Sequence, residues 1–146
     1  MRVIEQILDL ARWAPSGDNT QPWRFEVRAD DHVVVHGHDT REDIVYDLDG
    51  HASQIAIGAL LQTIEIAATR FRQAVQITRR TNAPDTRPTF DVRLAADANI
   101  GESDLVDSIK VRATQRRPMS MRRLGDAEKA VLEQAAAPGF EIHWWE

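Results

Sequence analysis

The stretch from residue 51 to residue 72 constrains the fold more than any other part of the chain. Its apolar residues recur at helical spacing and cover most of the circumference of a helix: Ile55, Ile57, Ala59, Leu60, Leu61, Ile64, Ile66, Ala67, Ala68 and Phe71. A helix that is apolar on nearly all sides is buried, so this stretch predicts a core helix. Gly58 and the alanines allow close approach of another backbone, at a domain centre or a subunit interface.

The other periodic segments predict strands and shorter helices around this core helix. A helix is predicted over 3–14, where Pro15 stops it, and a hairpin from strands 23–27 and 33–36. Further strands are predicted over 74–78, 89–95 and 140–145, and helices over 105–113 and 127–137, the last with Asp126 as N-cap and Pro138-Gly139 as its end. The chain therefore predicts an α+β fold, with a central, mostly antiparallel sheet packed on the long core helix.

Composition excludes several classes of protein. The 146 residues are 42% hydrophobic, which is enough for about one domain with a core. No run of apolar residues is long enough to span a bilayer and no signal peptide begins the chain, so a cytoplasmic location is expected. The chain has no cysteine, which excludes disulfides, iron–sulfur clusters and thiol chemistry.

The charge is unevenly distributed. The net charge of −5 disfavours nucleic acid as a partner, yet the stretch from Lys110 to Arg123 holds six basic residues and no acidic one. This local patch suits a small anionic ligand or a partner surface. Aromatic residues, which would stack on a single strand, do not interleave with it.

No metal site is expected from the histidines and aspartates. His36 and His38 would share one strand face with no carboxylate in register, so solvated strand histidines are the preferred interpretation of this segment, together with His32. The acidic loop has no calcium-loop spacing with a closing glutamate, and its carboxylates are interpreted as solvated: Asp43, Asp47 and Asp49.

Two motifs carry the chemistry. The first, APSGDNTQPWRF at residues 14–25, joins a helix to a strand through small hydroxyl and amide side chains. Such a loop suits a flat heteroaromatic ligand, and it also suits an ordinary turn. In the second motif, two guanidiniums and a hydroxyl could clamp a phosphate (Arg112, Thr114 and Arg116), although the same residues could be a solvated basic helix end.

The first motif resembles the P-S-x-x-N-x-Q-P-W segment by which FMN-dependent nitroreductases are commonly recognised, and there that segment lines the flavin. The second is similar to the family's R-x-S-x-R/K phosphate motif, with threonine in place of serine. The resemblance implies that the loop faces the isoalloxazine or ribityl part of FMN through Pro15, Ser16, Gly17 and Asn19. It also implies that the second motif holds the FMN phosphate, and that Trp23 anchors the following strand.

The order of the motifs predicts an incomplete member of that superfamily. In the family the phosphate motif comes first, whereas here it follows the loop. We therefore expect a first nitroreductase-like half over 1–100 and the start of a second half, with the phosphate-type motif, over 101–146. Such an arrangement fits a fragment or a two-halved member, including domains fused to ThiF-like adenylating domains of molybdopterin biosynthesis.

The function implied by the resemblance is an FMN-dependent oxidoreductase. Its flavin would be reduced by NAD(P)H and pass electrons to a nitroaromatic, quinone or similar acceptor. The partners implied are a second copy in a homodimer, or a missing C-terminal half. No catalytic residue is assigned. The alternatives are a non-catalytic protein that binds or sequesters flavin, and an interaction module that uses Lys110–Arg123.

Overall fold

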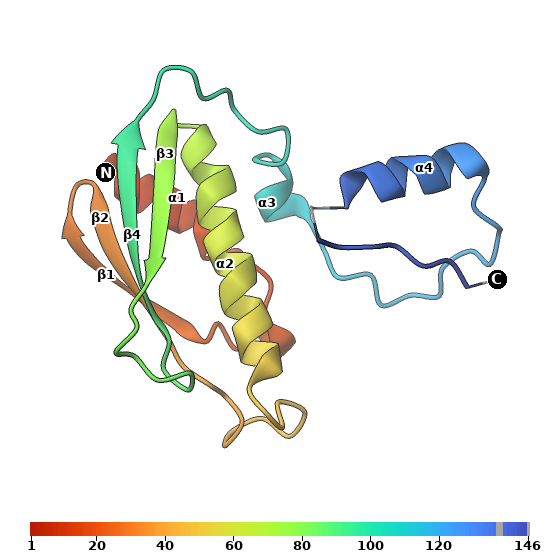
Figure 1. The fold of residues 1–146 in the computed structure, drawn as a ribbon, viewed down its shortest axis with the longest axis horizontal. Helices are drawn as coiled ribbons and strands as arrows, with labels where there is room; N and C mark the ends of the chain where they lie inside the picture. The colour runs from red at the N-terminus through yellow and green to blue at the C-terminus, as the bar shows by residue number, and fades with distance from the viewer. Residues whose placement is uncertain (137–138, 146) are drawn as a thin grey trace. The chain divides into compact units, whose positions relative to one another are not determined.

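The computed structural model describes residues 1–136 and 139–145, and these form two compact units, 1–113 and 114–146. The first unit contains the sheet and four helical segments (Figure 1). In chain order its elements are α1 (Val3–Ala11), the 3₁₀ turn η1 (Gly17–Asn19), β1 (Trp23–Ala29), β2 (His32–Gly37), α2 (His51–Thr69), β3 (Gln73–Arg79), β4 (Thr89–Ala96) and α3 (Ser108–Val111).

The four strands form one sheet in the order β1-β2-β4-β3, and every pairing is antiparallel. The predicted hairpin is confirmed, with Phe25 opposite Val35. The central pair, β2 and β4, sets Val33 opposite Val92. The α+β class and the antiparallel sheet predicted from the sequence are therefore confirmed, and no helix in the described part of the chain is long and apolar enough to cross a bilayer.

The core lies between one face of the sheet and the helices α1 and α2 (Figure 1). Alternate strand residues point into it, and α1 contributes one apolar stripe; the fully buried members include Ile4, Ile7, Val33, Val35, Leu60, Ile64 and Val92. Burial of each such side chain stabilises the fold by about 1.5–3 kcal/mol. This burial explains why the core helix was the clearest signal in the sequence.

Helix α2 is buried on one side only. Leu60 and Ile64 are buried, whereas Ile55 is 73% exposed. Nothing lies within 4 Å of the place where a Cβ on Gly58 would be. The helix ends at Thr69, because Arg72 adopts a left-handed conformation (φ 50°) and turns the chain into β3. The prediction of a long core helix is confirmed, and one of its faces remains uncovered in this chain.

The segment after the sheet belongs to the first unit. Of the helix predicted over 105–113, only α3 is formed, and it is preceded by a turn. Val106 and Ile109 are buried in the core of the first unit, so that unit ends at Ala113 rather than near residue 100. The interpretation of 101–146 as the start of a second half stays a prediction.

The second unit contains α4 (Asp126–Ala135). Gly125, not Asp126, is its N-cap, because Glu128 accepts a hydrogen bond from the Gly125 N–H at 2.9 Å. The helix ends at Ala135, and the stop predicted at Pro138 lies outside the described residues.

The strand predicted over 140–145 is wrong. No residue of 139–145 is in a strand, and Trp144 instead donates its indole N–H to Glu133 of α4 at 2.7 Å. Alternating apolar residues form a strand only where a neighbouring strand takes up their backbone hydrogen bonds, and the described part of this unit has no strand.

Candidate functional site

The loop after α1 is held by its own polar side chains. The Gln21 side-chain amide donates to the carbonyl of Arg12 at 3.1 Å, which satisfies a free carbonyl at the helix end. The Gln21 backbone N–H donates to Ser16 Oγ at 3.0 Å, so this hydroxyl closes the loop. Asp18 and Asn19 have positive φ angles (46° and 58°), which these short polar residues tolerate better than most.

Tyr46 lies directly against this loop. A Cβ on Gly17 would come within 2.6 Å of the Tyr46 hydroxyl, so only glycine permits the observed contact. Partial desolvation and the neighbouring Asp18 carboxylate raise the pKa of the Tyr46 phenol. Tyr46 could not be predicted from the sequence, because an aromatic residue in an acidic loop shows no periodicity that could place it.

Asp47, next to Tyr46, is buried and is not the solvated carboxylate that the sequence predicted. Its Oδ2 accepts hydrogen bonds from Thr40 Oγ1 at 2.7 Å and Ser53 Oγ at 2.5 Å, and its Oδ1 accepts one from the Ala52 N–H at 2.9 Å. These hydrogen bonds lower the pKa of Asp47 to about 2, against the effect of burial, which raises it. Asp47 thus fixes the acidic loop, and Tyr46 with it, to the start of α2.

Two of the strand histidines are also paired, which corrects the expectation that no carboxylate lies in register. His32 Nε2 is 2.8 Å from Asp91 on β4, and His36 Nε2 is 2.9 Å from Glu26 on β1. These are cross-strand pairs on the sheet face away from the helices. Within the described residues, no group of three His, Asp or Glu side chains could hold a metal ion.

An apolar pocket of about 300 Å³ joins the two sequence motifs. Pro15 of the first motif and Arg112 of the second both line it, together with residues of α2, the turn before α3 and α3 itself: Trp13, Ala59, Gln62, Thr63, Ile66, Leu105, Ser108 and Ile109. The Arg112 guanidinium donates to the Trp13 carbonyl at 2.8 Å. Residues far apart in the sequence therefore meet at one apolar surface that Arg112 borders.

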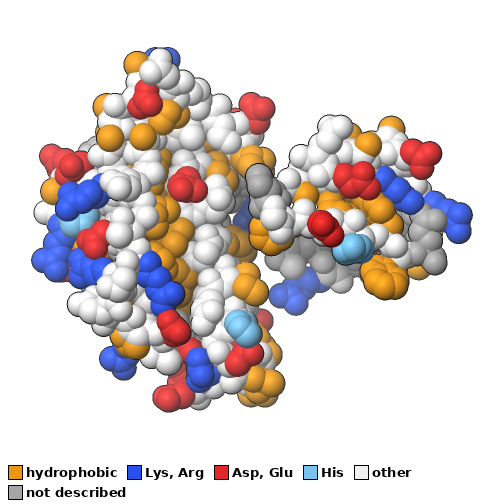
Figure 2. Space-filling view, in the orientation of Figure 1, with side chains coloured by type: hydrophobic (Ala, Val, Ile, Leu, Met, Phe, Trp, Pro, Cys, Tyr) orange, Lys and Arg blue, Asp and Glu red, His pale blue; other side chains and the backbone are white. Residues whose placement is uncertain are grey.

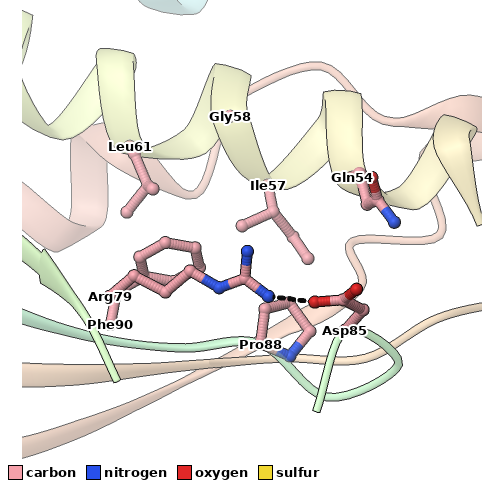
Figure 3. Close-up of a pocket in the computed structure, with 8 residues that line it drawn as sticks. All are labelled: Gln54, Ile57, Gly58, Leu61, Arg79, Asp85, Pro88 and Phe90. Atoms are coloured by element: carbon pink, nitrogen blue, oxygen red, sulfur yellow. Dashed lines mark hydrogen bonds and ion pairs between the residues drawn. The ribbon is translucent and has the colours of Figure 1, made fainter. Parts of the chain in front are cut away.

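A second hollow lies on the other border of the uncovered side of α2 (Figure 3). It has a volume of about 370 Å³ and an apolar floor that includes Ile57 and Phe90. Arg79 and Asp85 form an ion pair beside it. Apolar side chains are visible in the groove between the strands and α2 (Figure 2). Gly58 lines this hollow, so the exposed ridge of α2 is flanked by a pocket on each side.

Comparison with known proteins identifies the fold and, for part of the chain, the family. The model of the nitroreductase family matches residues 1–45, the part that contains the first motif. A crystal structure of a nitroreductase family protein from Clostridium difficile 630 superposes with a TM-score of 0.51 at 22% identity, over 84% of this chain and 86% of that one. The chain has a nitroreductase-like fold, and its N-terminal part matches the nitroreductase family.

Two curated proteins are similar to this chain over most of its length. They are the uncharacterized proteins Rv3127 and MT3212 from two strains of Mycobacterium tuberculosis, H37Rv and CDC 1551. Each is 32% identical over 121 residues, which is 80% of this chain. The chain spans about a third of the length of these relatives (35%).

The structure brings together only some of the predicted site residues of this nitroreductase-like chain. Ser16 is engaged within the loop, Gly17 packs under Tyr46, and Asn19 is exposed; none of the three lines the pocket at Pro15. Thr114 and Arg116 are exposed residues of the second unit. Their role with Arg112 as a phosphate clamp stays a prediction.

The pocket combines an apolar lining with one charged group. Its mostly apolar residues suit a flat ring, and one of the guanidinium groups of the second motif stands at the border. Arg112 uses one donor on the Trp13 carbonyl, and a guanidinium has five N–H donors, so further donors remain for an anion.

Proposed function

We propose that this chain provides part of the FMN site of a flavin-dependent oxidoreductase. The observation that carries the proposal is the shared pocket of Pro15 and Arg112, since it joins the two motifs that resemble the flavin-binding segments of nitroreductases. The family match over residues 1–45 supports it independently.

The residues of the pocket would bind and orient the cofactor. Trp13, Pro15 and Ile66 offer an apolar surface that excludes water from one face of a flat ring. Arg112 would donate charge-assisted hydrogen bonds to the phosphate, with Thr114 and Arg116 as further donors. When bound, FMN supplies the redox chemistry, with NAD(P)H as electron donor and a nitroaromatic, quinone or similar compound as acceptor.

The uncovered side of α2 is a surface on which a partner could pack, next to the pocket at Pro15 and Arg112. Ile55 and Gly58 are exposed between the two pockets, and a large exposed apolar residue beside a glycine suits close packing of another surface. We propose that a second copy of the chain covers this side, or else a C-terminal half like the remaining length of the curated relatives.

Titration with FMN, with riboflavin as the phosphate-free control, tests the proposal. We expect FMN to bind more tightly than riboflavin, and Arg112→Ala to remove at least about tenfold of that preference, because a charge-assisted contact contributes roughly 1.5–3 kcal/mol. Arg93→Ala, which removes an exposed arginine on β4, is the matched control and should leave the preference unchanged.

The outcomes separate the alternatives. Failure of both flavins to bind, in the chain and in its complex with any partner half, would refute a flavin site. Equal loss of binding in the Arg93→Ala control would refute the phosphate clamp. The absorbance of oxidised flavin, at about 450 nm, reports reduction of the bound FMN. Loss of this absorbance on addition of NADPH would support an oxidoreductase. Bound flavin that NAD(P)H does not reduce would indicate a non-catalytic flavin protein.

A further inference from the structure

A second anion site is suggested by a hollow on the sheet face away from the helices. It has a volume of about 570 Å³ and lies where β1 and β2 meet the loop between β3 and β4. Its basic and imidazole side chains come from separate segments: Arg24 from β1, His36 and His38 from the end of β2 and the residue after it, and Arg87 from the loop. It shares no residue with the pocket at Pro15 and Arg112.

The charge of this hollow contrasts with the rest of the chain. The described residues that line it include no aspartate or glutamate, although the chain carries a net charge of −5. Eight arginines elsewhere have a carboxylate partner: Arg2, Arg12, Arg28, Arg41, Arg70, Arg79, Arg80 and Arg122. In the described structure, the guanidiniums of Arg24 and Arg87 have none, and the same holds for Arg72, Arg93 and Arg112.

One carboxylate on the same sheet face, Glu26, is already engaged. Glu26 lies 2.9 Å from His36 Nε2 and 2.8 Å from Arg28, and the hydrogen bond to His36 is the main reason that its pKa is lowered. It therefore does not neutralise the two guanidiniums. Arg87 and His38 also line a neighbouring hollow that contains Asp39, Glu42 and Asp43. Among the described residues that line the hollow itself there is no carboxylate, so its basic side chains would attract an anion.

The size and lining of the hollow favour a phosphate on a small organic group. Two guanidiniums match the charge of a phosphate dianion, and guanidiniums bind its oxygens in pairs. The volume exceeds that of a bare anion, and Ala83, Pro84 and Trp23 add an apolar part to the lining. We propose that this hollow binds a small organic phosphate, whose phosphate group contacts Arg24 and Arg87.

Phenyl phosphate is the probe for this site, with phenol and phenylacetate as controls. Titration of the full ¹⁵N-labelled chain, followed by amide chemical shifts, should give saturable changes at residues 24, 36–38, 83 and 85–87. Arg24→Gln and Arg87→Gln should each weaken binding by at least about tenfold, since each removes a charge-assisted contact. Both side chains are exposed, so neither change disturbs the core.

Arg93→Gln provides the control for general charge, because Arg93 is an exposed arginine on the same sheet face that does not line the hollow. The proposal is overturned if Arg93→Gln weakens binding as much as Arg24→Gln, if phenylacetate binds as tightly as phenyl phosphate, or if no saturable changes occur at these residues. Changes confined to residues 112–116 would also overturn it, while supporting the flavin phosphate clamp. The two proposals can therefore fail separately.

Discussion

The buried carboxylate of Asp47 should be one of the main determinants of stability at neutral pH. Its pKa in the folded chain is about 2, compared with an ordinary value of 3.8. Folding thus favours the charged form, by roughly 2 kcal/mol at 1.36 kcal/mol per pKa unit. Because the folded pKa is lowered, this contribution is fully present above about pH 4, falls to about half near pH 3 and is lost as the pH drops through 2.

Asp47→Asn removes the charge and keeps the shape of the side chain. At pH 7 we expect the free energy of unfolding to fall by about 2 kcal/mol, because Thr40 and Ser53 then face an amide in place of a carboxylate that accepts from both. The measurement is urea denaturation followed by circular dichroism, at pH 7 and at pH 3. Asp43→Asn, an exposed position in the same loop, should change the free energy by less than about 0.5 kcal/mol.

The reasoning about Asp47 predicts a difference that shrinks with pH. The difference between wild type and Asp47→Asn should shrink to about half as the pH falls from 7 to 3, since the carboxyl of the unfolded chain is then largely protonated while that of the folded chain, with a pKa of about 2, is still mostly charged. A cost below about 0.5 kcal/mol at pH 7 would contradict the reasoning. So would a cost that is the same at both pH values, because it would show that shape and not charge holds the loop.

Two glycines give further predictions. Gly17→Ala should destabilise the chain by up to about 1 kcal/mol in urea denaturation, because the half-exposed Tyr46 ring must move away from the new methyl group. The cost should largely vanish in a Tyr46→Ala background, and an equal cost in both would contradict this contact. Gly58→Ala should stabilise the isolated chain by about 1 kcal/mol, since the position is helical and open, and should weaken self-association in sedimentation velocity if a second copy packs there. Destabilisation of the isolated chain by Gly58→Ala would contradict the observation that there is open space for a methyl group at this position.

Local periodicity was enough to predict the scaffold. The alternation at 23–27 and 33–36, with a short polar turn between them, leads to the β1–β2 hairpin. The apolar circumference of 51–69 leads to α2, which is buried against both α1 and the sheet. These signals are local, because each residue contributes to the pattern through its neighbours in sequence.

The site depended on contacts that no local pattern contains. The polar loop predicts a solvated Asp47, and only the approach of that loop to the start of α2 gives the carboxylate its three donors. His36 meets Glu26 through the hairpin register, which the histidine spacing alone does not reveal. The strand prediction for 140–145 was wrong because a local pattern does not show whether a partner exists. The alternation is typical of a strand, but no neighbouring strand lies beside it among the described residues.

Helix α2 links the fold to the proposed flavin site. Its buried side carries Leu60 and Ile64 into the core, while Ile66, two residues beyond Ile64, lines the pocket that contains Pro15 and Arg112. The exposed ridge at Gly58 adjoins both hollows, so a surface that packs on the ridge would also border the flavin pocket. An open apolar pocket binds weakly because one face of its ligand stays in water, and covering that face adds about 25 cal/mol for each Å² removed from solvent. Flavin affinity and association through α2 should therefore be coupled, each strengthening the other by the same factor.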